Sequence, residues 1–103
     1  MLFRSPSLLR YIQQILSRTR TDEHALYGAS PRGGLSLMRA SQALTALQGG
    51  TFVTPDHVKH LAPAVLAHRI VIKSRSRVQG VQGAKVVEDA LQEVEVPVDF
   101  EPV

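Results

Sequence analysis

Three Ser-Pro or Thr-Pro pairs divide this sequence and constrain its fold more than any other feature. The pairs are Ser5-Pro6, Ser30-Pro31 and Thr54-Pro55. A Ser or Thr hydroxyl can accept hydrogen bonds from the free N–H groups at a helix start, and proline suits the first helical position. Apolar residues at helical spacing follow each pair. The pattern therefore predicts helices that begin at these three prolines.

Each predicted helix carries one apolar stripe that should face a common core. The first helix should run to about Arg20, and the second should end before Gly49-Gly50. Pro63 lies inside the third pattern, so a kink or a break is expected near Ala62. The stripes comprise Leu8, Ile12, Ile15, Leu16 and Thr19, then Leu35, Leu37, Met38, Ala40, Leu44 and Leu47, then Val58, Leu61, Ala62, Val65 and Leu66.

The remaining segments predict one further helix and a small ribbon. A fourth helix should begin between Val81 and Ala84, because apolar residues at helical spacing follow. The β-branched run 70–72 could pair with 52–53 as a minimal two-stranded ribbon. Residues 21–29 are interpreted as a surface connection anchored by Leu26 and Tyr27, and residues 73–77 as a basic loop. The fold class is therefore all-α, a small bundle of three to four helices.

Composition limits the chain to one small domain. It has 103 residues, 44% of them hydrophobic and 20% charged. No apolar run is long enough to span a bilayer, and the first residues do not resemble a secretory signal. The chain has no cysteine, which excludes disulfides and thiolate chemistry. A cytoplasmic location without membrane contact is expected.

Several blocks of this sequence resemble the lid domain of the MoxR branch of AAA+ ATPases. The central block, residues 28–40, resembles the second sensor motif of that family, and the resemblance covers roughly residues 5–73 before it weakens. It implies a lid domain over residues 1–94 and a C-terminal tail over 95–103. The blocks are Thr19-Arg20, Gly28-Ala29-Ser30-Pro31-Arg32, Leu35 to Ala40, Phe52 to Val58 and Ala64 to Arg69.

The resemblance implies a role in ATP binding for residues 28–40, called the sensor block below. Arg32 would be the sensor arginine that reaches the terminal phosphates of ATP, with Ser30, Pro31 and Gly33 beside the nucleotide. A helix start with a guanidinium group is suited to phosphate oxygens. Gly33 and Gly34 would let the backbone approach the ligand closely. Arg39, about 10 Å further along the helix, is interpreted as structural or intersubunit.

The sequence also lacks the parts that hydrolyse ATP. It contains no phosphate-binding loop and no apolar strand that ends in acidic magnesium ligands. The chain alone should therefore not turn over ATP, and its start at Met1 suggests a fragment or a split product. The resemblance implies a nucleotide-binding core domain in the same parent protein, which would supply the Mg²⁺ site. It also implies neighbouring subunits of a homo-oligomeric ring, a chaperone-like role and proteins with von Willebrand A domains as partners.

Two other function classes stay open at this point. The positive net charge of +3 and the basic stretch Arg69 to Arg77 would suit a stand-alone DNA-binding module, although no aromatic residues interleave the stretch. A protein-interaction bundle that never meets nucleotide would need only the apolar stripes. Metal binding by His57, His60 and His68 is not expected at their spacing. Asp22 and Glu23 are interpreted as loop surface and not as a general acid and base. The lid-domain interpretation itself predicts no nucleic-acid partner and no metal site.

Overall fold

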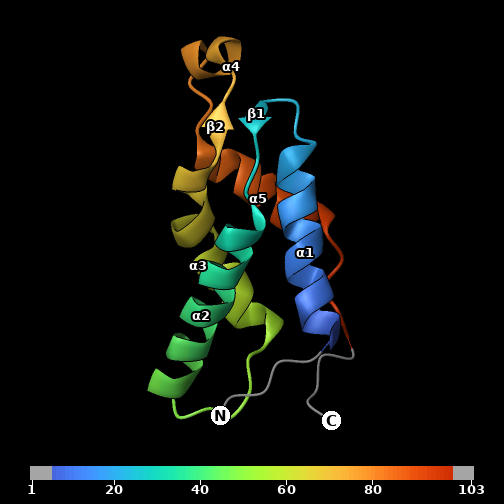
Figure 1. Cartoon of the computed structure of the whole chain (residues 1–103), viewed down its shortest axis with the longest axis vertical. Helices are drawn as coiled ribbons and strands as arrows, with labels where there is room; N and C mark the ends of the chain where they lie inside the picture. The colour runs from blue at the N-terminus through green and yellow to red at the C-terminus, as the bar shows by residue number, and fades with distance from the viewer. Residues whose placement is uncertain (1–5, 99–103) are drawn as a thin grey trace.

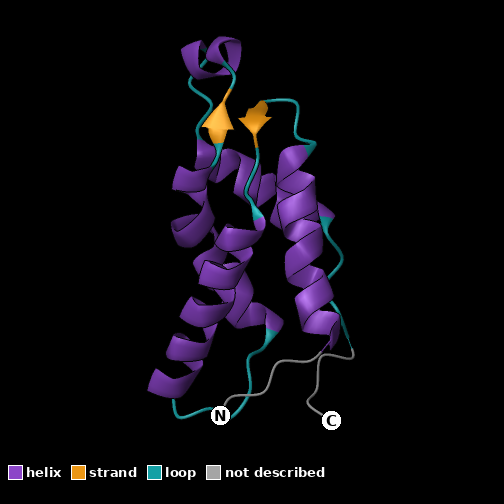
Figure 2. Ribbon diagram, viewed as in Figure 1, coloured by secondary structure: helices purple, strands orange, loops and turns teal. Residues whose placement is uncertain are grey.

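The computed structural model describes residues 6–98 and is mostly helical (Figures 1 and 2). The all-α prediction with a small ribbon is therefore confirmed. The elements in chain order are α1 (Pro6–Arg20), β1 (Ala25–Tyr27), α2 (Pro31–Leu47), α3 (Pro55–Leu66), the 3-10 turn η1 (Ala67–Arg69), β2 (Val71–Ile72), α4 (Ser74–Val78) and α5 (Gly83–Glu93). No helix within residues 6–98 is both long enough and apolar enough to cross a membrane.

The prolines mark the helix starts as the sequence predicts. Pro6, Pro31 and Pro55 are the first residues of α1, α2 and α3. At α3 the Thr54 side chain accepts a hydrogen bond from the His57 backbone N–H, and the His57 ring accepts one from the Thr54 N–H, which completes a capping box. The predicted cap of α1 falls on Ser5, which lies outside the described residues.

Helices α1, α2, α3 and α5 share one core. The molecule is elongated, with extents of 45 × 23 × 19 Å, and the β-ribbon and α4 project together from one end of the bundle (Figure 1). Burying these apolar side chains supplies the main driving force for folding. The fully buried core includes Leu8, Tyr11, Ile15, Leu37, Val53, Val58, Ala62, Leu66, Val86, Val87 and Ala90.

The buried face of α2 differs from the predicted stripe. Leu47 is 86% exposed and Leu35 is 48% exposed, whereas Ser41 and Thr45 are fully buried. Leu37 and Met38 are buried as predicted. The prediction was wrong for Leu35 and Leu47, because helical spacing permits several adjacent faces and the packing of α1 and α3 selects the one that carries Gly33 and Gly34.

The ribbon forms with another partner than predicted. β2 pairs antiparallel with β1, with Ala25 opposite Ile72 and Tyr27 opposite Val71. Val53, in the predicted partner segment, is instead buried in the core. Leu26 is the extra residue on β1 between the paired positions, which is a bulge. Leu26 and Tyr27 are 56% and 67% exposed, so they do not anchor this connection as predicted, and the buried Ala25 does.

Two smaller predictions also need correction. The basic stretch 73–77 is not a loop, because residues 74–78 form α4. Pro63 does not break α3 into two pieces, because the helix continues to Leu66 before η1 begins, and the alternative of a kink near Ala62 stays a prediction. A proline removes a single backbone hydrogen bond, and the helix keeps its packed face at Val58, Ala62 and Leu66. The fourth predicted helix is confirmed as α5.

Candidate functional site

The block 28–34 lies where the chain returns past the end of α1 and enters α2. Gly28 touches the backbone of α1 directly: a Cβ atom there would lie 2.5 Å from the Arg20 nitrogen and 2.6 Å from the Thr19 carbonyl carbon. No side chain fits between two backbones at that separation. Glycine at this position therefore fixes how closely the segment before α2 can approach α1.

Thr19 and Arg20 hold Ala29, the residue after Gly28, through its N–H and its carbonyl. The buried Thr19 hydroxyl accepts a hydrogen bond from the Ala29 N–H at 3.0 Å and donates one to the Leu16 carbonyl at 2.6 Å. The Arg20 guanidinium donates to the Ala29 carbonyl at 3.0 Å. Ala29 itself is fully buried. Its peptide groups are thus fixed immediately before the first turn of α2.

The start of α2 presents Arg32 outward. Ser30 occupies the N-cap position as predicted, but its side chain makes no capping hydrogen bond. Its carbonyl accepts the Gly33 N–H at 2.9 Å and the Gly34 N–H at 3.3 Å. The Arg32 side chain is exposed and makes no hydrogen bond or ion pair with any residue in the described range 6–98. It is therefore available to an anion from outside the bundle.

Gly33 and Gly34 have a packing role that the sequence did not reveal. Both are buried in the face of α2 that meets the other helices. A Cβ at Gly34 would lie 2.7 Å from Leu16 Cδ1, and one at Gly33 would lie 3.1 Å from Leu66 Cδ2. Because glycine has no side chain, α1 and α3 can pack closely against the first turn of α2. Contact between Gly33 and a ligand stays a prediction.

A surface hollow adjoins this block. It has a volume of about 390 Å³ and is lined by Arg20, the exposed Leu26 and Tyr27, and residues 28–31. The sequence interpretation gave Arg20 only a favourable place at the end of a helix. The hydrogen bond from the Arg20 guanidinium to the Ala29 carbonyl depends on how the chain turns between α1 and α2. Helical spacing does not encode that turn.

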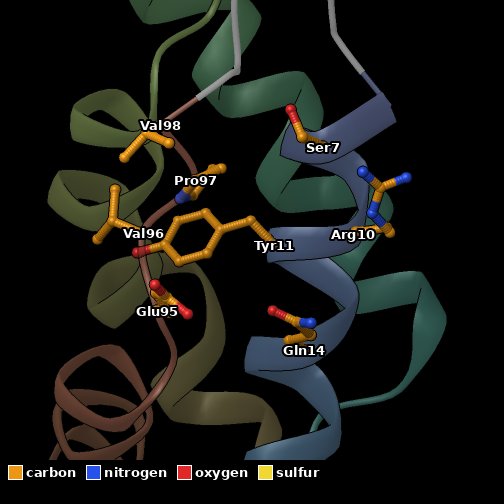
Figure 3. A pocket seen from close by; sticks show the side chains of 8 residues that line it. All are labelled: Ser7, Arg10, Tyr11, Gln14, Glu95, Val96, Pro97 and Val98. Atoms are coloured by element: carbon orange, nitrogen blue, oxygen red, sulfur yellow. The ribbon is translucent and has the colours of Figure 1, made fainter.

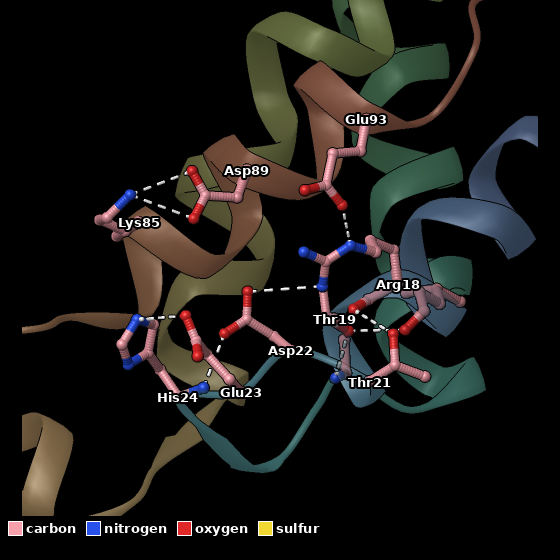
Figure 4. A network of polar contacts seen from close by, with 11 residues as sticks. Arg18, Thr19, Thr21, Asp22, Glu23, His24, Lys85, Asp89 and Glu93 are labelled. Atoms are coloured by element: carbon pink, nitrogen blue, oxygen red, sulfur yellow. Dashed lines mark hydrogen bonds and ion pairs between the residues drawn. The ribbon is translucent and has the colours of Figure 1, made fainter.

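A polar network next to this site joins the end of α1 to α5 (Figure 4). Arg18 forms ion pairs with Asp22 and with Glu93. The hydrogen bond from Arg18 lowers the pKa of Glu93 and raises the pKa of Arg18. Asp22 is 5% exposed and also accepts the His24 N–H, so its interpretation as loop surface was wrong. Neighbouring Glu23 is exposed, as expected.

His24 and His57 make contacts that serve local structure. The His57 ring contacts Thr54 and Thr45 through Nδ1 and Gln48 through Nε2 at 2.9 Å. His24 Nδ1 lies 2.9 Å from the Ser76 hydroxyl and links β1 to α4. Within residues 6–98, no group of three or more potential metal-ligating side chains is close enough to hold a metal ion.

A second hollow lies at the opposite end of α1 (Figure 3). It has a volume of about 250 Å³, and residues 95–98, part of the predicted tail, form one of its walls. Tyr11 points from α1 toward this segment, and burial raises its pKa, with a smaller contribution from Asp56. Residues 99–103 lie outside the described residues. The predicted boundary at residue 94 stays a prediction.

Comparison with known proteins agrees with this geometry, which is that of a helical lid domain. The family model described as AAA lid domain matches residues 17–94. YeaC of Bacillus subtilis is 36% identical over 89% of this chain and 29% of its own length. Chaperone MoxR1 of Mycobacterium tuberculosis is 28% identical over 88% of this chain and 26% of its own length. The crystal structure of a candidate ATPase from Cytophaga hutchinsonii superimposes with a TM-score of 0.85 at 27% identity, over 90% of this chain and 31% of that protein.

The chain belongs to the AAA lid domain family. More particularly, it is a lid domain of the MoxR type of AAA+ ATPase, as the sensor block indicates and the match to MoxR1 supports. It spans less than a third of the length of these relatives, 29% in YeaC and 26% in MoxR1.

Proposed function

We propose that this chain closes over ATP bound to a nucleotide-binding core domain and places Arg32 on the terminal phosphates. The observation that carries the proposal is an exposed arginine without a partner among residues 6–98, at the first turn of α2. The preceding Ala29 peptide groups are held by Thr19 and Arg20, so the base of this turn is rigid. Because the backbone that carries Arg32 is already ordered, phosphate binding does not have to order it.

The residues around Arg32 at the start of α2 also favour phosphate binding. A helix start carries partial positive charge, and a guanidinium there can form a charge-assisted fork with phosphate oxygens. Ser30 offers a hydroxyl that makes no capping bond, and Pro31 brings no competing N–H. We place Ser30, Pro31 and Gly33 beside the nucleotide, with Mg²⁺ held by the core domain. ATP hydrolysis would then belong to the assembled protein and not to this chain alone.

The wider role follows from the same proposal. Movement of the lid with the nucleotide state would pass to neighbouring subunits of a homo-oligomeric ring. MoxR1 of Mycobacterium tuberculosis is named a chaperone, and we propose by similarity a chaperone-like remodelling role in the cytoplasm for the protein that contains this chain. Proteins with von Willebrand A domains are proposed as partners. Arg39, exposed on α2, is assigned to structure or to contact between subunits.

The test is ATP turnover by the full-length protein that joins this chain to its core. Arg32→Ala should lower kcat/KM by about 10²-fold, the usual effect of removing one donor from a developing charge. Arg32→Lys should recover part of the loss, because the lysine ammonium keeps the positive charge but cannot form the paired hydrogen bonds of a guanidinium group. The matched control is Arg10→Ala, an exposed arginine on α1 at the far end of that helix from the block 28–34, which should change kcat/KM less than about twofold. Equal turnover in folded wild-type and Arg32→Ala proteins would overturn the proposal.

A further inference from the structure

Arg69 stands apart from the other basic residues that follow it in the sequence. It is half-buried in η1 and donates through Nε to the Val65 carbonyl at 3.3 Å. Through Nη2 it donates to the Ser36 hydroxyl at 3.1 Å. Lys73 and Arg75, by contrast, lie exposed beyond β2. Arg69 thus ties the end of α3 to the second turn of α2, the helix that begins with the sensor block.

The stem of Arg69 also occupies the space that Gly33 leaves open. A Cβ at Gly33 would lie 3.2 Å from Arg69 Cδ, closer than ordinary van der Waals contact. Gly33 directly follows Arg32, and Ser36 lies one turn further along the same face as Arg32. The side chain of Arg69 therefore lies along the face of α2 that carries Gly33 and Ser36, and Gly33 is the sequence neighbour of Arg32.

The backbone that carries Arg69 is itself fixed. Gly83, the first residue of α5, lies so close to the Ala67 carbonyl oxygen that no side chain could stand between them. Ala67 begins η1, and the Ile70 N–H donates back to its carbonyl at 3.3 Å. The start of α5 thus holds the turn in place, and Arg69 reaches α2 from an anchored base.

Charge makes this arrangement more than a packing contact. Within residues 6–98 neither Arg32 nor Arg69 pairs with a carboxylate. Two like charges on one face of a helix repel each other. Arg69 is held by two hydrogen bonds and Arg32 by none among residues 6–98, so Arg32 is the side chain that can move in response to its neighbour's charge.

We infer that Arg69 is a positioning residue for Arg32: by occupying the Gly33–Ser36 face of α2, it keeps the Arg32 guanidinium extended toward the phosphates of ATP. The inference rests on the proposed function. It explains why a half-buried arginine lies at this point bonded only to neutral oxygens, those of Val65 and Ser36. It also gives the small residue at Gly33 a role in presenting the arginine that precedes it.

The experiment is a double-mutant cycle on ATP turnover by the full-length protein. Arg69→Met should lower kcat by about tenfold and change KM for ATP by less than about twofold, because misplacing a reacting group costs rate. Arg69→Lys, which keeps the charge, should recover part of kcat. In the Arg32→Ala background, Arg69→Met should cause no further loss, since Arg69 acts through Arg32. Ser36→Ala, which removes one hydrogen bond and keeps the fold, should lower kcat less than Arg69→Met does.

The outcomes separate the two proposals. If Arg32→Ala leaves turnover unchanged, the sensor assignment fails and the positioning role fails with it. If Arg32→Ala lowers turnover but Arg69→Met and Ser36→Ala do not, only the role of Arg69 is overturned. An equal loss from Arg69→Met in both backgrounds would also overturn it, because the two residues would then act independently. Thermal melting of each variant identifies unfolded proteins, and Ser36→Ala carries the test if Arg69→Met does not fold.

Discussion

Gly28→Ala tests the geometry that fixes the sensor block. In the structure, the added methyl carbon would lie 2.5 Å from the backbone nitrogen of Arg20 and 2.6 Å from its Cα. Ordinary van der Waals contact begins at 3.4 Å, so the segment before α2 must move away from α1 by nearly one ångström. The obstructing atoms belong to a helix backbone, so a side-chain rotation cannot relieve the clash.

The energetic cost has two parts. Overpacking of this kind costs about 1–3 kcal/mol. The movement also stretches the 3.0 Å hydrogen bond from the Ala29 N–H to the Thr19 hydroxyl beyond bonding distance. Leaving a buried partner unsatisfied costs roughly 1–3 kcal/mol more. A total loss of about 3 kcal/mol would lower the Tm of a domain of this size by at least about 12 °C.

The assay is thermal and urea unfolding of the chain, followed by circular dichroism. The matched control is Gly34→Ala in the same block, where the added carbon meets Leu16 Cδ1 at 2.7 Å. That atom is the end of a flexible side chain, and alanine favours a helix over glycine by about 1 kcal/mol, so the net change should be small. If Gly28→Ala melts within about 2 °C of the wild type, the close backbone contact is not what fixes this segment.

Three further predictions concern buried or paired polar groups. Thr19→Val should lower the free energy of unfolding by about 1–3 kcal/mol, because the Ala29 N–H loses its acceptor in a buried position. Ser41→Ala should leave stability unchanged or raise it by up to about 1 kcal/mol, since the Ser41 hydroxyl is buried without a hydrogen-bond partner among residues 6–98. Both are measured by urea unfolding. Glu93→Gln should weaken the pH dependence of the urea midpoint between about pH 7 and pH 3. The ion pair with Arg18 holds the pKa of Glu93 below its ordinary value, so this stabilisation is present above the ordinary pKa and is lost as pH falls through the lowered one.

Each of these three predictions has a result that would contradict it. An unchanged unfolding free energy in Thr19→Val would show that the Ala29 N–H finds another acceptor. A large loss in Ser41→Ala would mean that the hydroxyl has a partner after all. For Glu93→Gln, a matched change at the exposed Glu88 controls for net charge. If both variants show the same acid dependence, the contact with Arg18 is not its source.

The amino-acid sequence by itself determined where the helices begin and which family the chain belongs to. The starts at Pro6, Pro31 and Pro55 follow from interactions between residues close together in the chain, which are the fixed φ of proline at each start and the capping box of Thr54 at the third. The sensor block is likewise continuous in sequence. For that reason Arg32 could be singled out as the candidate phosphate ligand without any knowledge of packing, and its exposed position agrees with that role.

Only the tertiary structure decided which faces and distant segments meet. Ser41 is buried and Leu47 is exposed because α1 and α3 select one of several faces that the spacing on α2 allows. β2 pairs with β1 because the chain leaving α1 passes alongside it, and local propensity does not encode that path. Arg69 forms a hydrogen bond with Ser36, a residue 33 positions away in the chain. Contacts of this kind depend on how the whole core packs, because hydrophobic burial has no preferred direction, whereas a helix cap depends on only four or five neighbouring residues.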